Sequence, residues 1–424
     1  MKRVKNTIKK ILKLFGPGFI TGAADDDPSG IATYSQTGAL FGYKQLWTSL
    51  FVFPFLTVVQ EMCGRIGMVT GKGLAGVARK HYSKPILFFS VGLLALVNTI
   101  NLGANLGAMV SSVQLLIGIP TIILFSCIVL ASLALQIFIP YKAYSRYLKY
   151  LSFALLAYIV TAFLVKQNLP QAIYFTFVPN FDFSKTYLLN IVAILGTTIS
   201  PYLFFWQAGE EVEEEVANHK IKEMGLGTPN VNIRDIRQMK SSTIAGMFFS
   251  CLAMYFIILT TASTLHIHGI EDIETAAQAA EAIRPFAGSF TFFLFTLGII
   301  GAGLLANPIL AGSASYAVSE CFGWKTGLYR KLKSAKSFYS IIIVVTVVGL
   351  LVNFCPIPPF KMLYYSAVLN GICAPPLMIM IMYISNNNKI MGKYTNGRFS
   401  NIFGWIIIAV MSVAAAAVII SHLC

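Results

Sequence analysis

The feature that most constrains this chain is a series of long apolar runs that recurs from one end of the sequence to the other. Each run is about 20 residues long, which is the length of helix needed to cross a hydrocarbon core of roughly 30 Å. Of the 424 residues, 56% are hydrophobic and only 12% are charged. A soluble protein would carry about twice that charged fraction. The sequence therefore predicts a single transmembrane domain over residues 1–424, and not a soluble core with an anchor.

The apolar runs predict an all-α integral membrane protein with eleven spans. The predicted ranges are 15–40, 45–64, 85–115, 120–140, 147–165, 187–207, 243–265, 287–318, 338–354, 362–384 and 401–421. With this assignment, 27 of the 32 Lys and Arg residues fall on one side of the membrane and five on the other. The positive-inside rule then predicts a cell-membrane protein with its N-terminus in the cytoplasm and its C-terminus outside. The net charge of +15 follows from this distribution and does not indicate a nucleic-acid partner.

Two cytoplasmic segments carry concentrated charge. Residues 1–14 are basic and amphipathic, which is typical of an interfacial helix attracted to anionic lipid but equally of a simple positive flank. Residues 208–242 are expected to form a loop with an acidic part followed by a basic part. On a helix Glu210 and Glu214 would share a face and attract cations at the inner mouth. A solvated acidic turn that balances Lys220 and Lys222 is the more ordinary interpretation.

Two of the spans contain a sequence that an uninterrupted helix disfavours. The first span reads TGAADDDPSG over residues 21–30, and the sixth reads LGTTISP over residues 195–201. Proline removes a backbone donor, and the small residues beside it let the helix unwind. Unwound backbone at membrane depth is tolerated only where protein or water satisfies it. Because these are corresponding spans of two five-helix halves, the sequence predicts an inverted repeat with a substrate site between broken helices 1 and 6.

The first break contains three consecutive aspartates, Asp25, Asp26 and Asp27. An aspartate at the centre of a membrane helix costs about 2.5–3.5 kcal/mol, so at least one should face a cavity or a cation. Asp27 directly precedes Pro28 and is best placed to bind a central ion. Asp25 and Asp26 are expected to form an outer vestibule, a proton acceptor or a second contact. The alternative is that the break lies near an interface and that all three are solvated caps.

Several motifs resemble those of the Nramp metal-ion transporters. The resemblance is strongest in the first seventy residues, and span order and spacing agree over nearly the whole chain. The segments that carry it are GPGFI at 16–20, DPSG at 27–30, FGY at 41–43, LW at 46–47, GRIGMVTGKGL at 64–74 and GTTISP at 196–201. The resemblance implies the superfold of the amino-acid transporters, with a 5+5 inverted repeat, and divalent metal ions as substrate.

The sequence departs from the Nramp pattern at the positions that would bind the metal. The family's Asp-Pro-Gly-Asn becomes a motif that ends in Gly30, which has no side chain to replace the asparagine. The family's Ala-x-x-Met-Pro-His becomes Thr197 to Tyr202, with Ser200 in place of the soft methionine ligand. Carboxylate, hydroxyl and carbonyl oxygens suit hard cations such as Mg²⁺, Ca²⁺ or Mn²⁺.

The residues expected along the transport pathway are mostly neutral. In the resemblance, the third span of the family carries acids thought to pass a proton, whereas here Asn101 and Asn105 lie in that region. Proton coupling of the family's kind is therefore not expected unless Asp25 or Asp26 replaces those groups. Asn101 and Asn105 either line the pathway or hydrogen-bond between helices. Gln207 and Asn370 are further polar candidates for the pathway.

We therefore expect secondary-active transport of a divalent cation, most simply Mg²⁺ or Mn²⁺, by alternating access. Asp27 would supply the charge, Thr197 and Ser200 hydroxyl oxygens, and the unwound backbone near Ala24 carbonyl oxygens. The alternative is a transporter of the same fold that carries an organic amine or amino acid after losing the metal site. An intramembrane enzyme and a passive channel are disfavoured, because the acids cluster on one helix and the breaks are paired. The expected partners are the metal ion and membrane lipid, with no cofactor, and a monomer is expected.

Overall fold

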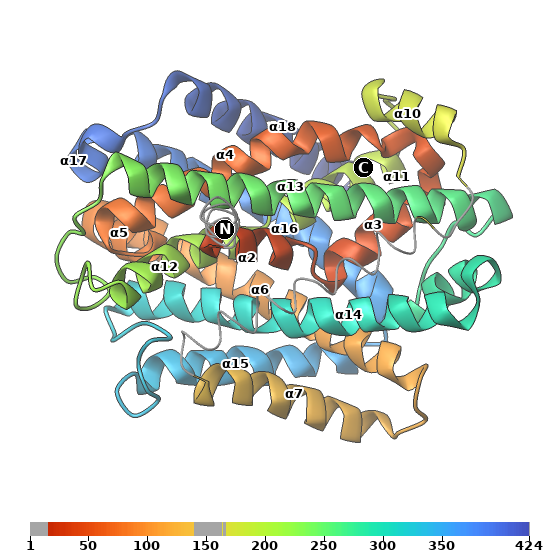
Figure 1. Ribbon diagram of the computed structural model, residues 1–424, viewed down its shortest axis with the longest axis horizontal. Helices are drawn as coiled ribbons and strands as arrows, with labels where there is room; N and C mark the ends of the chain where they lie inside the picture. Colours follow the sequence, from red (N-terminus) through yellow and green to blue (C-terminus); the bar gives the residue numbers. More distant parts are fainter. Residues whose placement is uncertain (1–15, 140–162, 164–166, 424) are drawn as a thin grey trace, which may run out of the picture.

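The computed structural model describes residues 16–139, 163 and 167–423, and this part of the chain is helical without any β-strand. The long helices run along one common axis, so that their connections gather at two opposite ends of the bundle (Figure 1). The long and half-length helices are α2 (Pro17–Asp25), α3 (Pro28–Phe41), α4 (Trp47–Thr70), α6 (Lys84–Gln114), α7 (Thr121–Phe138), α11 (Lys185–Thr198), α12 (Pro201–Ala217), α13 (Ile233–Thr264), α14 (Ala276–Phe322), α15 (Lys336–Leu351), α16 (Pro359–Asn386) and α18 (Arg398–Leu423).

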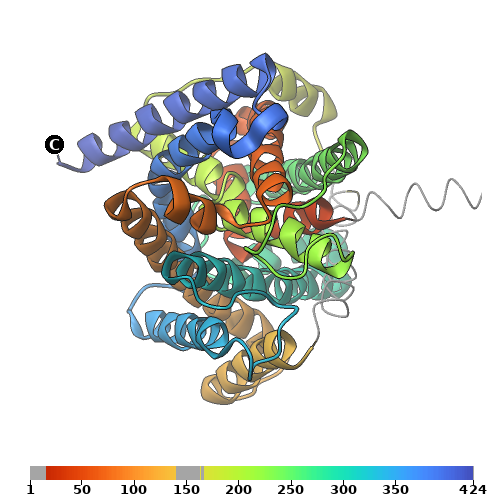
Figure 2. The same ribbon diagram turned by 90° about the vertical axis from the view of Figure 1, so that its left-hand side faces the viewer.

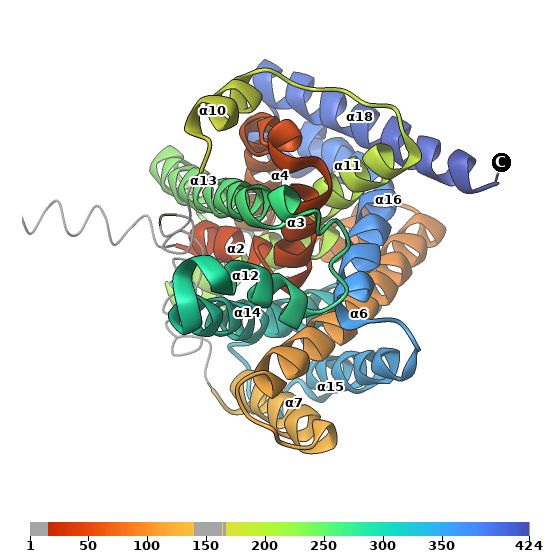
Figure 3. The ribbon, with the colours of Figure 1, turned by 90° about the vertical axis from the view of Figure 1, so that its right-hand side faces the viewer.

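Short helices occupy the two ends of the bundle. They are α5 (Leu74–His81), α10 (Leu169–Phe177), α17 (Asn388–Met391), η1 (Gly42–Gln45), η3 (His266–His268), η4 (Val352–Phe354) and η5 (Gly392–Tyr394). The end that carries α5 and α17 faces the viewer in Figure 2, and the opposite end, with α10, faces the viewer in Figure 3. In the orientation that the charges predict, the first is the cytoplasmic end.

The predicted all-α membrane fold is confirmed. Within the described residues, nine helical segments are long and apolar enough to cross a membrane. The first predicted span is present as the two half-helices α2 and α3, and the span predicted at 147–165 falls almost entirely outside the described residues. Helices α13 and α14 begin at Ile233 and Ala276, about ten residues before their predicted starts. Both begin with a capping box, a local polar signal that hydropathy does not detect.

The two helix breaks have the same backbone geometry. In the first, Asp26 has φ −85° and ψ 56°, and Asp27 is extended with φ −69° and ψ 172°. In the second, Ile199 has φ −104° and ψ 60°, and Ser200 is extended with φ −78° and ψ 132°. In both breaks a proline follows at the first position of the next half-helix, where its missing N–H costs nothing. This equivalence supports the predicted inverted repeat, although the side chains at the two breaks differ.

Small residues allow the half-helices α2 and α12 to pack closely on neighbouring helices. At the contact of α2 with α13, a Cβ added to Gly22 would lie 2.1 Å from the carbonyl carbon of Gly246. At the contact of α12 with α4, a Cβ added to Gly67 would lie 2.2 Å from the carbonyl oxygen of Ala208. Membrane helices approach this closely only where small residues expose the backbone.

The acidic part of the predicted loop at 208–242 is helical and buried, so the expectation of a solvated turn is wrong. Helix α12 continues to Ala217, and the connection to α13 is only residues 218–232. Glu213 shows why the charge can be buried: it accepts hydrogen bonds from the Tyr316 hydroxyl at 2.6 Å and from the Leu328 and Tyr329 amides at 2.5 and 3.1 Å. The acids of this run that are at most 2% exposed are Glu210, Glu211, Glu213 and Glu215.

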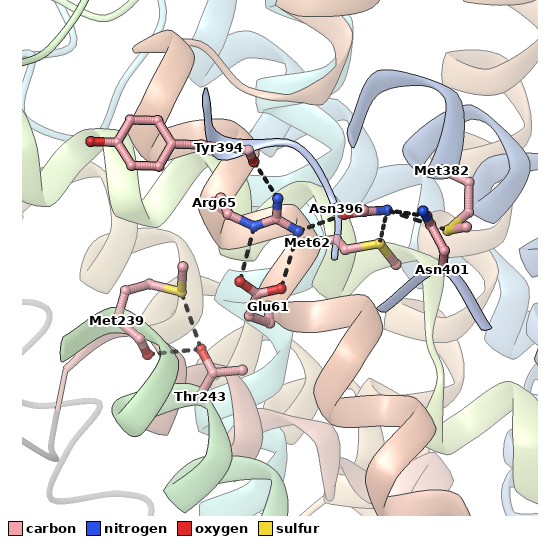
Figure 4. Close-up of polar contacts among 9 residues, drawn as sticks. All are labelled: Glu61, Met62, Arg65, Met239, Thr243, Met382, Tyr394, Asn396 and Asn401. Carbon is pink, nitrogen blue, oxygen red and sulfur yellow. Dashed lines mark hydrogen bonds and ion pairs between the residues drawn. The ribbon is translucent and has the colours of Figure 1, made fainter. Parts of the chain in front are cut away.

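Arg65 of α4 forms an ion pair within its helix and also hydrogen-bonds to the segment before α18 (Figure 4). Arg65 Nε lies 2.9 Å from Glu61 Oε1, and both side chains are less than 10% exposed. The same guanidinium donates to the Tyr394 carbonyl, and it donates to the Asn396 side chain at 2.6 Å. The four-residue spacing of Glu61 and Arg65 places the two side chains on one face of α4. The bonds of Arg65 to Tyr394 and Asn396 connect this ion pair to the segment before α18.

Candidate functional site: a buried carboxylate where the two breaks meet

Asp27 lies where the two helix breaks meet. It is 1% exposed and caps the N-terminus of α3, accepting a hydrogen bond from the Gly30 amide at 2.8 Å through Oδ1. The Ser29 hydroxyl donates to the same oxygen at 2.5 Å. Ser29 Oγ also lies 3.2 Å from Thr197 Oγ1 of α11, so one hydroxyl contact joins the first break to the second.

The second carboxylate oxygen of Asp27 faces α6. Asn101 and Asn105, one turn apart, donate to Oδ2 from their Nδ2 atoms at 3.2 and 3.3 Å. Asn101 also accepts a hydrogen bond from Ser366 of α16 at 3.1 Å, whereas Oδ1 of Asn105 is buried without a hydrogen-bond partner. The two asparagines thus contact the central carboxylate and do not merely join helices. All four donors to Asp27 are neutral, and no ion pair reaches it within the described residues.

Asp25 and Asp26 face away from Asp27 toward α13. Ser250 donates to Asp25 Oδ2 at 2.6 Å and to Asp26 Oδ1 at 3.3 Å. The other oxygen of each carboxylate is buried without a hydrogen-bond partner. Because both residues are 0% exposed, the interpretations of an outer vestibule and of solvated caps are wrong for this conformation. In the part of the chain that is described, no three His, Cys, Asp or Glu residues converge as a metal site, so neutral oxygens would have to complete any site at Asp27.

The remaining predicted ligands fall into two groups. Tyr202 donates from its hydroxyl to the Ala24 carbonyl at 2.8 Å, which joins α12 to the end of α2. Ser200 donates to the carbonyls of Gly196 at 2.8 Å and Thr197 at 2.6 Å, so its hydroxyl points back along α11. The Tyr202 side chain therefore links the two breaks, whereas the Ser200 side chain is bonded to carbonyls at the end of α11.

Gly30 leaves space between the two breaks. A Cβ added there would lie 3.3 Å from the Asp25 carbonyl oxygen and 3.4 Å from Thr197 Oγ1. Cε2 of the Tyr34 ring would also lie 3.3 Å away, and a side chain larger than a methyl group would have to displace one of these three neighbours. The glycine thus keeps open the approach to oxygens from both broken helices.

A cavity lies at each end of the bundle, on opposite sides of the buried aspartates. The outer cavity is about 350 Å³ and includes Gln36, Glu271 and Asp272 in its lining. The inner cavity is also about 350 Å³, and its lining includes Glu214 and Glu215. Since Asp25, Asp26 and Asp27 are almost fully buried, this conformation is closed between the two cavities.

The predicted pathway residues occupy three places. Gln207 donates to Glu211 at 2.9 Å, and Glu211 in turn lines the inner cavity together with the half-buried Glu214. Glu210 is buried in α12 but is not among the residues that line that cavity. Asn370 is fully buried in α16, and neither polar atom of its side chain has a hydrogen-bond partner.

The sequence reasoning missed three hydroxyl residues near the site. Ser29 was noted only as part of a motif, although it contacts both Asp27 and Thr197. Ser250 contacts the other two aspartates from α13, more than 220 positions away in the sequence. Tyr34 is buried one turn further along α3, with its hydroxyl 3.0 Å from Thr198. Only the spacing of Ser29 next to Asp27 gave a local signal; the other two contacts depend on how the helices pack.

A bundle of membrane-spanning helices with paired breaks that meet at a buried carboxylate defines a multi-pass membrane transporter. The profile of the family described as "Natural resistance-associated macrophage protein-like" matches residues 18–421, and the chain belongs to this Nramp family.

The chain is also similar to curated proteins named divalent metal cation transporter MntH. It is 25% identical to the Bacillus subtilis protein over 416 residues, which cover 95% of this chain and 91% of that protein. It is 24% identical to a Klebsiella pneumoniae protein over 408 residues, which cover 94% and 92% of the two chains.

Solved structures show the same fold. A crystal structure of the Eremococcus coleocola manganese transporter matches with a TM-score of 0.75 at 16% identity and covers 96% of this chain and 86% of that chain. Mhp1, a nucleobase-cation-symport-1 family transporter in a closed conformation, matches with a TM-score of 0.64 at 14% identity and covers 96% and 90%. The fold is therefore common to these transporters, and the side chains of the site must decide the substrate.

Proposed function

We propose that this protein carries a divalent metal cation across the membrane by alternating access, with Asp27 as the charged ligand. The observation that carries the proposal is the position of Asp27, buried where two broken helices meet and surrounded by oxygen-bearing side chains and unwound backbone. Paired broken helices are the place where secondary transporters bind substrate. The names of the MntH relatives and of the manganese transporter support a metal as cargo.

The cation would displace donors that now satisfy Asp27. Asn101 and Asn105 point their N–H groups at Oδ2. These partly positive hydrogens would repel a cation bound to that oxygen. A rotation of each amide would direct its Oδ1 to the ion, and Asn105 Oδ1 has no hydrogen bond to lose. Amide and hydroxyl oxygens are ligands of hard cations. The proposed set is therefore Asp27, Asn101 and Asn105, with Thr197, Ser29 and backbone carbonyls near Ala24.

We infer that the preferred ions are hard, with Mg²⁺ and Mn²⁺ as the leading candidates. All the ligands proposed above present oxygen, whereas soft metals favour sulfur ligands. Mg²⁺ dehydrates reluctantly and usually keeps several waters, so an incomplete set of protein ligands suits it. Gly30 supplies no side-chain ligand, and the Ser200 hydroxyl is bonded to the Gly196 and Thr197 carbonyls, so waters would complete the coordination of the ion.

We expect inward transport without the proton route of the family. Asn101 and Asn105 do not titrate, so only Asp25 and Asp26 remain beside the site as proton acceptors. The inner cavity would receive the cation after α2 moves, because Pro17 at the start of α2 and Glu214 at the end of α12 both line it. The carboxylates there would attract the departing cation.

The test is uptake by proteoliposomes that contain the purified protein, with Mg²⁺, Ca²⁺ and Mn²⁺ offered separately. We expect saturable uptake and counterflow for Mg²⁺ or Mn²⁺, and loss of both in Asp27→Asn. Asp182→Asn is the matched control, because Asp182 is exposed and lies outside the site. If no divalent ion is taken up while an amine or amino acid shows counterflow, the metal proposal is wrong and the organic-substrate alternative replaces it.

A further inference from the structure

A further cavity lies at the predicted cytoplasmic end, away from the transport site. Its volume is about 570 Å³. It is enclosed by three segments that are far apart in the sequence: residues 72–80 with α5, residues 223–226 between α12 and α13, and residues 320–330 after α14. These segments lie together at one end of the bundle (Figure 2). Nothing in the proposed transport cycle uses this cavity.

The lining carries a concentrated and unbalanced positive charge. Its basic residues are Lys72, Arg79, Lys80, Lys325 and Arg330. Its acids, Glu223 and Glu320, are both engaged by the protein itself. Glu223 pairs with Arg330 at 2.6 Å. Glu320 accepts from the Gly73 and Gly76 amides at 2.6 and 2.9 Å.

Four of the five cations therefore face the cavity without a carboxylate partner among the described residues: Lys72, Arg79, Lys80 and Lys325. The pKa of Lys72 is lowered by burial and then by repulsion from Lys80, against an attraction by Glu320. Positive-inside charge explains why Lys and Arg lie on this side, but it does not require them to converge on one concave surface. A bound anion would relieve this repulsion.

The rim of the cavity is suited to lipid. Trp324 in the lining stacks on Phe322 with ring centroids 4.9 Å apart, and Phe322 contacts Phe88 of α6 at 5.8 Å. The three residues are 41–50% exposed. Exposed aromatic rings at the end of a membrane helix are typical of the interface between headgroups and acyl chains. A ligand with a phosphate and a hydrocarbon portion would contact both the basic lining and these rings.

We propose that this cavity binds a phosphate group, and that its source is the headgroup of an anionic phospholipid in the cytoplasmic leaflet. Basic pockets on the cytoplasmic side of membrane helices bind such headgroups. The lipid would join α5, the 218–232 connection and the segment after α14, and it would raise the stability of the conformation in which the three are together. The inference depends on neither the transported substrate nor Asp27.

The experiment measures binding of phosphatidylglycerol to the purified full-length chain in detergent by native mass spectrometry. The test variant is Lys72→Gln/Lys80→Gln/Lys325→Gln. The control is Lys240→Gln/Lys331→Gln/Lys333→Gln, which removes equal charge from exposed residues on the same side but outside the cavity. At about 1 kcal/mol for each lysine near an anionic lipid, the test variant should bind at least tenfold more weakly. The control should change by less than about twofold.

Two further arms identify the source and guard against misfolding. Phosphatidylcholine should not bind at the site, and inorganic phosphate or ATP should not raise the melting temperature. If inorganic phosphate or ATP raises the melting temperature of wild type but not of the test variant, the cavity binds phosphate but its source is not the lipid headgroup. If the test variant does not fold, the proposal is tested in the wild-type protein by quenching of Trp324 fluorescence with brominated phosphatidylglycerol. Trp324→Phe gives the quenching of the other tryptophans. Equal binding by test and control variants, or no quenching of Trp324, overturns the proposal.

Discussion

The two serines at the helix breaks should differ sharply in their effect on cation affinity. Ser29 donates to Asp27 Oδ1 at 2.5 Å and lies 3.2 Å from Thr197, so its hydroxyl is positioned at the proposed ion site. Ser29→Ala removes a hydroxyl oxygen from the proposed ligands of the cation, a loss comparable to that of a hydrogen bond to a charged group, about 1.5–3 kcal/mol. At about 1.4 kcal/mol per factor of ten, KM for the transported cation should rise roughly 10- to 150-fold.

Ser200→Ala is the matched comparison, because Ser200 is the serine of the other break. Its hydroxyl bonds only to the Gly196 and Thr197 carbonyls at the end of α11. The expected cost is about 1 kcal/mol of stability with less than about a threefold change in KM. Both variants are measured by initial rates of uptake in proteoliposomes and by thermal unfolding in detergent. A larger rise in KM for Ser200→Ala than for Ser29→Ala would refute this assignment of the site.

Three further substitutions test the packing and the inner cavity. Gly22→Ala would bring a Cβ to 2.1 Å from the α13 backbone, so we expect a loss of about 1–3 kcal/mol and a lower melting temperature. Glu61→Gln leaves the buried Arg65 without its carboxylate, and a loss of about 3–5 kcal/mol is expected in the same assay. Glu215→Gln removes a buried carboxylate that has no hydrogen-bond partner, so stability should hold or rise while uptake at low ionic strength slows.

Each of these predictions has its own control. Gly92→Ala should be tolerated, because a Cβ there meets nothing within 4 Å. Replacing both members of the ion pair, Glu61→Gln with Arg65→Met, should recover part of the stability that the single change loses. A loss of stability in Glu215→Gln comparable to that of Glu61→Gln would show that this carboxylate has a structural role and would contradict its place in the pathway.

The spans and the two breaks could be predicted because their signals are local. A hydrocarbon core sets the length of each apolar run, and a proline beside small residues marks an interruption whatever the helix packs against. Asp27 was identified for the same reason, since it stands directly before the proline that restarts the helix. The alternation of basic residues predicted which connections lie on the same side of the membrane.

The parts that could not be predicted depend on contacts between distant segments. The acidic run after the second break is polar enough to suggest a loop, yet Glu213 is buried by Tyr316 and by backbone amides more than 110 positions away. Ser200 was expected to bind the ion because of its place in the motif, but its hydroxyl bonds to the carbonyls at the end of α11. Ser250 could be identified only from the packing of α13 on α2.

The most direct test of the central claim is isothermal titration of Mg²⁺ and Mn²⁺ into the purified protein, for wild type and Asp27→Asn. The substitution keeps the size of the side chain, and the Gly30 amide can still donate to its oxygen, so the fold should be retained. We predict saturable binding of at least one ion to wild type, and binding weakened at least a hundredfold, about 2.7 kcal/mol, in Asp27→Asn. Equal binding by a folded Asp27→Asn protein would contradict the claim that the two broken helices bind the cation through Asp27.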